Sequence, residues 1–285
     1  MTSTTAGTVG TVIGALARCY PPEWAASWDR VGLVLGELDA PVRRVLCVVD
    51  CLPETVAEAL AVGADLILAH HPLLLRPVSS VAPTTYQGRI VHQLIRNQVA
   101  LYVAHTNADV ANPGVSDALA TRIGLRELRP LRPGVGDDRV DDGSGRGTGR
   151  IGVLPQPRTL AELTRQVAAA LPPTAWGVRA AGEPDRLIRT MAVCGGAGDA
   201  YLADAAAAGV DAYLTADLRH HPVSEHLAGG GPALLDAAHW ATERPWLDQA
   251  AGWLRATLDL ETVVSDLDTD PWTGHAPGPS RKAAP

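Results

Sequence analysis

The stretch GADLILAHH at residues 63–71 decides the fold, because it occurs a second time, in altered form, as GVDAYLTAD at residues 209–217. Each copy has a glycine that ends a helix, an acidic residue, an apolar strand and polar residues where the strand ends. The similarity continues with ALYVAHTNAD at residues 100–109 and PALLDAAHWATE at residues 232–243. We infer an internal duplication of two similar halves that face each other and share a site at their junction.

Around these stretches, short apolar runs alternate with Ala-rich segments of helical periodicity. This alternation predicts an α/β fold with largely parallel sheets. In the first half we expect strands at 45–49, 66–68 and 101–104 and helices at 53–62, 89–98 and 115–123. In the second half we expect strands at 190–194, 212–214 and 233–235 and helices at 199–208, after Arg219, and from about 243 to 257.

The expected division of the chain follows from composition. Residues 1–132 form the first α/β half and residues 151–269 the second. Between them, residues 133–150 are dense in Gly, Asp and Arg and lack apolar periodicity, which favours a flexible connector. The tail at 270–285 is rich in Pro, Gly and Ala and is expected to be disordered.

Composition also limits the function. The chain has 285 residues and a net charge of −7, which makes nucleic acid an unfavourable partner because its binding needs clustered Lys and Arg. No apolar run is long enough to span a membrane and no secretion signal precedes the first helix, so we expect a cytoplasmic protein. The four cysteines are scattered, which favours buried small hydrophobic residues over disulfides or a thiolate metal site (Cys19, Cys47, Cys51 and Cys194).

Histidines and acids concentrate where the predicted strands end. His70 and His71 follow the run LILA, and at a strand end both imidazoles can reach one cavity. His239 and Glu243 are four residues apart, which places them on one side of a helix turn, and His105 and Asp109 repeat this spacing. Taken alone, each pair also fits a plain capping or solvated role.

Taken together, these side chains indicate a metal site. Imidazole and carboxylate donors without thiolate suit Zn, Fe, Mn, Ni or Co and do not choose among them. Five ligands, His70, His71, Asp109, His239 and Glu243, exceed what one catalytic ion usually takes from protein, whereas two ions sharing a bridging carboxylate would use them all.

Six motifs resemble, in order, the signature motifs of the Nif-three-like dinuclear metal family, often labelled GTP cyclohydrolase I type 2 homolog. They are WDRVGLVLGE at 28–37, AHHPLLL at 69–75, HTNAD at 105–109, CGGAGD at 194–199, TADLRHH at 215–221 and AAHWATERP at 237–245. The positions Arg30, Ala197 and Ala216 depart from the family's pattern, and none of them is an expected ligand.

The resemblance implies metal ligands at His70, His71, Asp109, His239 and Glu243, the set that the strand ends also suggest. It places His105 near the metals, as a candidate for orientation or proton transfer, and Asp217 and His221 along the cavity. It also implies a homohexamer with a small nucleotide-like ligand. The glycines of CGGAGD fit a tight turn better than a phosphate loop, so we expect no cofactor site beyond the two divalent ions.

Three functions remain open at this point. The first is a metal-dependent hydrolase, similar to a GTP cyclohydrolase I type 2, acting on a nucleotide-like or phosphorylated substrate. The second is a non-catalytic metal-binding scaffold or regulatory protein. The third is a purely structural two-metal site that holds the halves together, which predicts a large loss of thermal stability on chelation.

Overall fold

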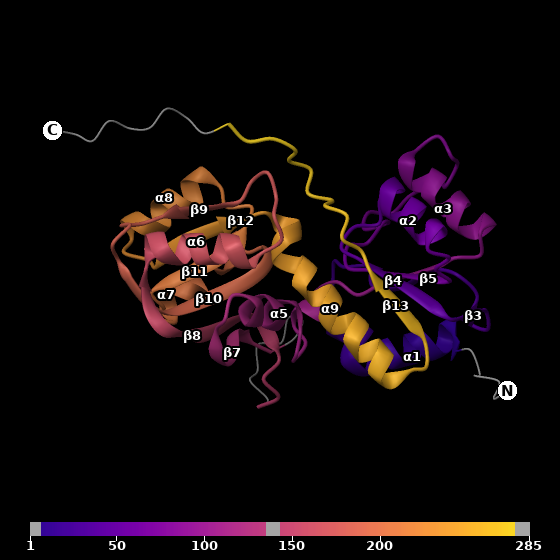
Figure 1. The fold of residues 1–285 in the computed structure, drawn as a ribbon, viewed down its shortest axis with the longest axis horizontal. Helices are drawn as coiled ribbons and strands as arrows, with labels where there is room; N and C mark the ends of the chain where they lie inside the picture. Colours follow the sequence, from indigo (N-terminus) through magenta and orange to yellow (C-terminus); the bar gives the residue numbers. More distant parts are fainter. Residues whose placement is uncertain (1–6, 135–142, 277–285) are drawn as a thin grey trace.

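The first sheet lies at the right of Figure 1, and four of its five strands come from the N-terminal part of the chain. The computed structural model describes residues 7–134 and 143–276. Three parallel strands form the centre of this sheet, β4 (Arg44–Val48), β5 (Leu66–Ala69) and β6 (Ala100–Val103). β2 (Gly32–Leu35) is antiparallel at one edge and β13 (Glu261–Val264) parallel at the other, giving the order β13-β4-β5-β6-β2.

Helices and a small ribbon complete this part of the molecule. Helices α2 (Pro53–Ala61) and α3 (Tyr86–Arg96) pack against one face of the sheet through an apolar cluster of their own. The other face packs with α1 (Val9–Cys19), which is followed by the short helix η1 (Pro22–Trp24). A two-stranded ribbon joins β1 (Gly7–Thr8) to β3 (Pro41–Val42).

The second sheet has six strands in the order β7-β8-β10-β11-β12-β9 and lies at the left of Figure 1. Its central strands β10, β11 and β12 are parallel and its outer strands antiparallel. The strand bounds are β7 (Arg126–Pro133), β8 (Gly147–Thr159), β9 (Val178–Ala181), β10 (Leu187–Ala197), β11 (Ala212–Ala216) and β12 (Ala233–Ala237). The associated helices are α6 (Leu160–Ala170), η2 (Asp199–Tyr201), α7 (Leu202–Ala207) and α8 (His220–Ala228).

The two sheets repeat one arrangement. In each, three consecutive parallel strands are followed across the sheet by an antiparallel strand that precedes them in the chain, β2 in one and β9 in the other. The duplicated motifs also fold alike. Gly63 and Gly209 turn the chain at φ 66° and φ 67°, and Asp65 and Asp211 each accept two backbone N–H groups from the neighbouring strand. The expected α/β class is confirmed, and the strand order is consistent with the predicted duplication.

Helix α9 (His239–Thr257) runs between the two parts of the molecule (Figure 1). It contacts α5 (Val115–Arg122) and β10 on the side of the second sheet and β4 and β13 on the side of the first. One apolar core includes residues of both sheets and of α9, among them the fully buried Trp246. This shared core fixes the position of α9, which carries part of the site described below.

The structure differs from the expected division in three places. Residues 147–150 of the expected connector belong to β8, while 135–142 lie outside the described residues. β13, from the expected second half, pairs with β4 of the first sheet. Of the expected disordered tail, residues 270–276 are placed and Asp270 is buried, whereas 277–285 lie outside the described residues. Strand pairing and burial by distant residues override the local composition in each case.

Two further expectations concern cysteines and membranes. Cys47, Cys51 and Cys194 are buried, Cys19 is partly buried, and all four are free thiols, as the sequence predicts for small apolar residues. Among the residues that the structure describes, no helix combines the length and the apolar character needed to cross a bilayer.

Candidate metal centre

Side chains from the carboxyl ends of four parallel strands meet at one place. His70 and His71 follow β5, and His105 follows β6, where it precedes the one-turn helix α4 (Thr106–Asp109). From the second sheet, Asp217 follows β11 and His239 follows β12. Helix α9 begins at His239, four residues before the expected start, so Glu243 lies one turn into the helix and faces His239.

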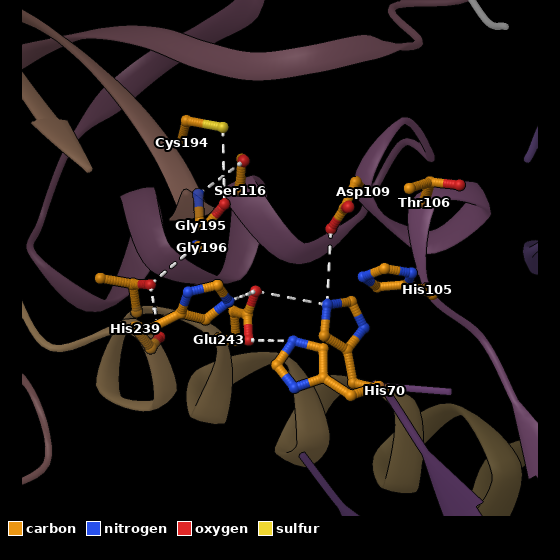
Figure 2. Close-up of polar contacts among 12 residues, drawn as sticks. His70, His105, Thr106, Asp109, Ser116, Cys194, Gly195, Gly196, His239 and Glu243 are labelled. Carbon is orange, nitrogen blue, oxygen red and sulfur yellow. Dashed lines mark hydrogen bonds and ion pairs between the residues drawn. The ribbon is translucent and has the colours of Figure 1, made fainter. Parts of the chain in front are cut away.

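Glu243 lies at the centre of the cluster (Figure 2). Its Oε1 is 3.1 Å from Nε2 of His239 and 3.5 Å from Nε2 of His70, and its Oε2 is 3.1 Å from Nε2 of His71. The carboxylate is only 3% exposed. Thus one buried carboxylate uses its two oxygens toward imidazoles from both sheets, which is the position that a bridging ligand would occupy.

The opposite ring nitrogen of every histidine in the cluster is held by an oxygen. Nδ1 of His71 bonds Oδ1 of Asp50 at 2.7 Å, and Nδ1 of His239 bonds Oδ2 of Asp217 at 2.6 Å. The other two bonds run from Nδ1 of His70 to the carbonyl of Ala104 and from Nδ1 of His105 to Oδ1 of Asp29, both at 2.9 Å. Because carboxylates and carbonyls accept, each Nδ1 carries the hydrogen, and in the neutral ring Nε2 keeps a free lone pair.

These free lone pairs face one another. His71, His239 and Glu243 offer donor atoms within 4.8 Å of each other, and so do His70, His71 and His105. Nε2 of His70 is buried without a hydrogen-bond partner among the described residues, and Oε2 of Glu243, although 3.1 Å from Nε2 of His71, accepts no hydrogen bond of good geometry from them. Buried polar atoms are rarely left unpaired, so these orphaned donors fit a bound divalent cation. Imidazole and carboxylate donors without thiolate again suit Zn, Fe, Mn, Ni or Co.

Asp109 lies at the edge of this cluster. Its Oδ1 is 3.7 Å from Nε2 of His70, and Figure 2 shows it turned toward the histidines. His105 lies beside it, with its ring edge-on to His70 at a centroid distance of 5.1 Å. The structure therefore brings together all five expected metal ligands and the expected catalytic histidine, whereas His221 belongs to α8 and contacts the ring of His220.

The electrostatics of the cluster favour bound cations. Burial lowers the pKa of His71 and His239, but Glu243 and the paired carboxylates Asp50 and Asp217 outweigh it and raise the values to about 10 and about 11. Burial raises the pKa of Glu243, yet the three facing histidines hold it well below its usual range. Without a metal the cluster therefore holds extra protons, and a divalent ion would replace them.

The glycines of CGGAGD bring β10 close to the cluster. A Cβ on Gly196 would lie 2.4 Å from Oε1 of Glu243 and 3.0 Å from Nε2 of His239, and this residue has φ 68°. The backbone N–H of Gly196 donates to Oγ1 of Thr242, and that of Gly195 donates to Oγ of Ser116. Glycine is required here for close backbone approach, in line with the expected turn rather than a phosphate loop.

A cavity of about 540 Å³ opens beside the cluster. His71 and His239 line one part of it together with Asp50 and Asp217, and Trp176, Arg179 and Trp272 line another. A cavity of this size suits a small molecule. Residues 270–272 of its lining come from the segment expected to be disordered.

Sequence reasoning missed the acids behind the histidines. Asp50 directly follows the first predicted strand, 45–49, so the strand-end rule that selected His70 would also have selected Asp50. Asp29 lies in the quoted motif WDRVGLVLGE, but its role needs the structure, because it contacts His105 and Thr106 from 76 and 77 residues away. Burial alone would raise the pKa of Asp29. The hydrogen bonds from His105 and Thr106 outweigh this effect and hold the pKa below its usual range.

Comparison with known proteins gives the family. Residues 8–271 match the family Duf34/NIF3, NGG1p interacting factor 3. A Streptomyces coelicolor protein named GTP cyclohydrolase 1 type 2 homolog is 53% identical over 282 residues, covering 96% of this chain and 98% of its own length. A protein of the same name from Clostridium perfringens is 31% identical over 263 residues, covering 92% and 97%.

Solved structures agree with this assignment. A Bacillus cereus protein related to NIF3 superimposes with a TM-score of 0.85 at 25% identity, over 94% of this chain and 99% of the other. A hypothetical protein of Staphylococcus aureus does so with a TM-score of 0.84 at 26% identity and the same coverage. The resemblance inferred from the six motifs is thereby confirmed, and the chain belongs to the DUF34/NIF3 family.

Proposed function

We propose that this protein is a hydrolase that depends on two divalent metal ions and acts on a nucleotide-like or phosphorylated substrate. One observation carries the proposal: three imidazoles, those of His70, His71 and His239, are each held at Nδ1 by an oxygen and have Nε2 3.1–3.5 Å from the buried carboxylate of Glu243. The name GTP cyclohydrolase 1 type 2 homolog, printed for relatives, is in keeping with hydrolytic chemistry.

The donor set divides naturally into two ligand groups. His71, His239 and Glu243 would hold one ion. The other ion would be held by His70 and Asp109 together with Glu243, whose Oε1 lies 3.5 Å from Nε2 of His70. Asp50 and Asp217 keep His71 and His239 oriented and raise the basicity of their free nitrogens. Asp217 adopts φ 59°, and its short polar side chain tolerates this left-handed conformation better than most residues.

Two such ions, when bound, supply Lewis-acid polarisation of the reacting oxygen and a clamp on the scissile group. The chain itself supplies the proton carrier. Asp29 fixes the Nδ1–H of His105, so Nε2 is the atom that takes up or delivers a proton at the cluster. The side chain of Asp29 is fully buried and also accepts from Thr106, which holds the pair rigidly.

The proposal is tested with protein loaded with Zn, Mn, Fe, Ni or Co and a panel of nucleotides and phosphoesters. We expect turnover that is lost in both His70→Ala and Glu243→Ala, together with metal content. In His105→Gln and Asp29→Asn we expect turnover to fall while two metals per chain remain. Turnover that persists in His70→Ala and Glu243→Ala would overturn the hydrolase assignment to this site.

The same experiment separates the alternative functions. Two bound metals without turnover across the panel would favour a metal-binding scaffold or regulatory protein. Far fewer than two metals per chain under all loading conditions would overturn the dinuclear site. Loss of metal in His105→Gln would make His105 a ligand instead of a proton carrier.

Two further properties are proposed, the first from the family resemblance and the second from the sequence. We infer that the protein forms a homohexamer and that it works in the cytoplasm. Light scattering coupled to size-exclusion chromatography tests the first, and a single-chain mass would contradict it. Fractionation of cells that express the tagged protein tests the second, and recovery outside the cytosolic fraction would contradict it.

A further inference from the structure

The cavity beside the cluster has an aromatic part that the proposed metal chemistry does not use. The rings of Trp176 and Trp272 lie with centroids 6.1 Å apart and planes inclined by 32°. Both line the cavity of about 540 Å³ that also reaches His71 and His239. Trp272 is 61% exposed, which is unusual for the largest apolar side chain unless something covers it.

Trp176 is held in place before any ligand arrives. The guanidinium of Arg179 lies over its ring at 4.6 Å, and Nε of Arg179 donates to Oδ2 of Asp236 at 2.6 Å. Nη2 of Arg179 also donates to the carbonyl of Leu218 at 3.0 Å. These contacts fix the indole just before β9, at the edge of the second sheet.

Trp272 is brought to the cavity by a strap, which we define as residues 265–272. The strap leaves β13 in the first sheet and runs toward β9 and β12 of the second, as the yellow segment of Figure 1 shows. Oγ of Ser265 donates to Glu58, Oγ1 of Thr269 donates to Oδ2 of Asp50, and the N–H of Trp272 donates to Oδ1 of Asp270. Because Asp50 also accepts from Nδ1 of His71, the strap is connected to the cluster through this carboxylate.

We infer that Trp272 and Trp176 form a subsite for a flat heteroaromatic ring on the same small molecule whose other end reaches His71 and His239. Indole faces stack on such rings with little regard to their substituents, and stacking on one indole contributes about a tenfold gain in affinity. The inference rests on the proposed function for the metal end of the ligand. Beyond that function, it proposes that the ligand carries an aromatic ring and that the strap selects ligands with such a ring.

Calorimetric titration of the zinc-loaded protein tests the subsite, with AMP, UMP and ribose 5-phosphate as probes. All three carry a phosphate, and only the first two carry a ring. We expect AMP to bind about tenfold more tightly than ribose 5-phosphate, with UMP between them because a smaller ring stacks less. Equal binding of the three probes, or no measurable binding of AMP, would overturn the subsite.

Variants of the strap locate the effect. Trp272→Ala should weaken AMP about tenfold, to the level of ribose 5-phosphate, and leave ribose 5-phosphate unchanged, while Trp272→Phe should keep the preference for AMP. Leu267→Ala is the matched control, since Leu267 lies in the same strap, is 40% exposed and is not part of the cavity lining. A preference for AMP that survives in Trp272→Ala and Trp176→Ala would place the ring elsewhere.

The readouts keep this inference separate from the proposed function. Binding of the probes does not require turnover, and the metal content of each variant is measured beside it. Ring-dependent binding without turnover would leave the subsite standing and contradict the hydrolase. Turnover on ring-free phosphoesters with no preference for binding AMP would support the hydrolase and contradict the subsite.

Discussion

The imidazole of His71 lies between two carboxylates, with Nδ1 2.7 Å from Oδ1 of Asp50 and Nε2 3.1 Å from Oε2 of Glu243. Asp50 follows β4, His71 follows β5, and Glu243 belongs to α9, so this one side chain connects adjacent strands to the helix between the sheets. Asp217 and His239 repeat the relationship from the second sheet. The orientation of the ligands is thus built into both sheets.

Neutralising Asp50, the carboxylate behind His71, should weaken metal binding without removing a proposed ligand. In Asp50→Asn we expect the affinity for Zn to fall about 10- to 100-fold, because an uncharged amide oxygen replaces the carboxylate that orients His71 and raises its basicity. Competition with a chromophoric chelator measures the change. Asp266→Asn is the control, because the side chain of Asp266 is 92% exposed and pairs with Arg244, away from the cluster. Equal affinities in the two variants would contradict the role of Asp50.

The metal-free protein should lose stability as the pH rises from 6.5 to 8.5. The pKa values of His71 and His239 are raised to about 10 and about 11, so the folded state holds protons that the unfolded state has released. This stabilisation is fully present below the unfolded pKa of about 6.5. Above that pH, the free energy of unfolding falls by about 1.4 kcal/mol per pH unit for each extra proton that the folded state holds. The pH window ends at 8.5, because above it the buried cysteines, whose pKa values burial raises, also begin to change the free energy of unfolding.

Thermal unfolding at several pH values checks this prediction. In the zinc-loaded protein the metal has displaced these protons, so its Tm should fall less, and the gap between loaded and metal-free protein should widen with pH. Metal-free His239→Gln lacks one of the two groups, and its Tm should fall less steeply than that of the metal-free parent. Parallel curves for loaded and metal-free protein would contradict the assignment of the extra protons to this cluster.

A methyl group at Gly196 should disrupt the cluster from the side of β10. In Gly196→Ala the new Cβ would lie 2.4 Å from Oε1 of Glu243, and φ 68° is unfavourable for alanine. We expect at least a tenfold loss of Zn affinity with the overall fold retained, as measured by chelator competition and circular dichroism. Gly14→Ala is the control, since nothing lies within 4 Å of its Cβ in helix α1. Unchanged affinity in Gly196→Ala would show that β10 can move aside.

The grouping of the candidate ligands could be predicted from the sequence because they obey a local rule. His70 and His71 stand directly after an apolar strand, and His239 and Glu243 have the spacing of one helical turn. Their strands are parallel, so their carboxyl ends lie at the same edge of each sheet. Nothing beyond period and chain order is needed to group them.

The surroundings of these ligands follow no local rule. Thr269 contacts Asp50 across 219 residues, and Asp29 contacts His105 across 76. The composition of the tail predicts disorder because Pro and Gly disfavour helices and strands, yet the strap is held by Glu58, Asp50 and Trp176, which are distant partners that composition cannot reveal. β13 joins the first sheet for the same reason, since its pairing with β4 depends on the course of α9.

The buried pair of Arg150 and Asp117 should stabilise the junction of β8 with α5. Nε and Nη2 of Arg150 donate to the two oxygens of Asp117 at 2.7 and 2.6 Å, and Arg150 is 1% exposed. In Asp117→Asn the guanidinium keeps the carbonyls of Ala111, Gly147 and Gly149 but loses its counter-charge. We expect the free energy of unfolding to fall by about 3–5 kcal/mol, measured by urea denaturation of the metal-loaded protein.

An exposed pair provides the comparison. Glu261→Gln removes the partner of Arg44 at a site where both side chains are at least a third exposed, and we expect a change below about 1 kcal/mol. If Asp117→Asn cost no more than Glu261→Gln, the charge of Arg150 would be satisfied by the three carbonyls alone. The pair would then add nothing to the stability of the contact between β8 and α5, which would depend on those carbonyl bonds and on apolar packing.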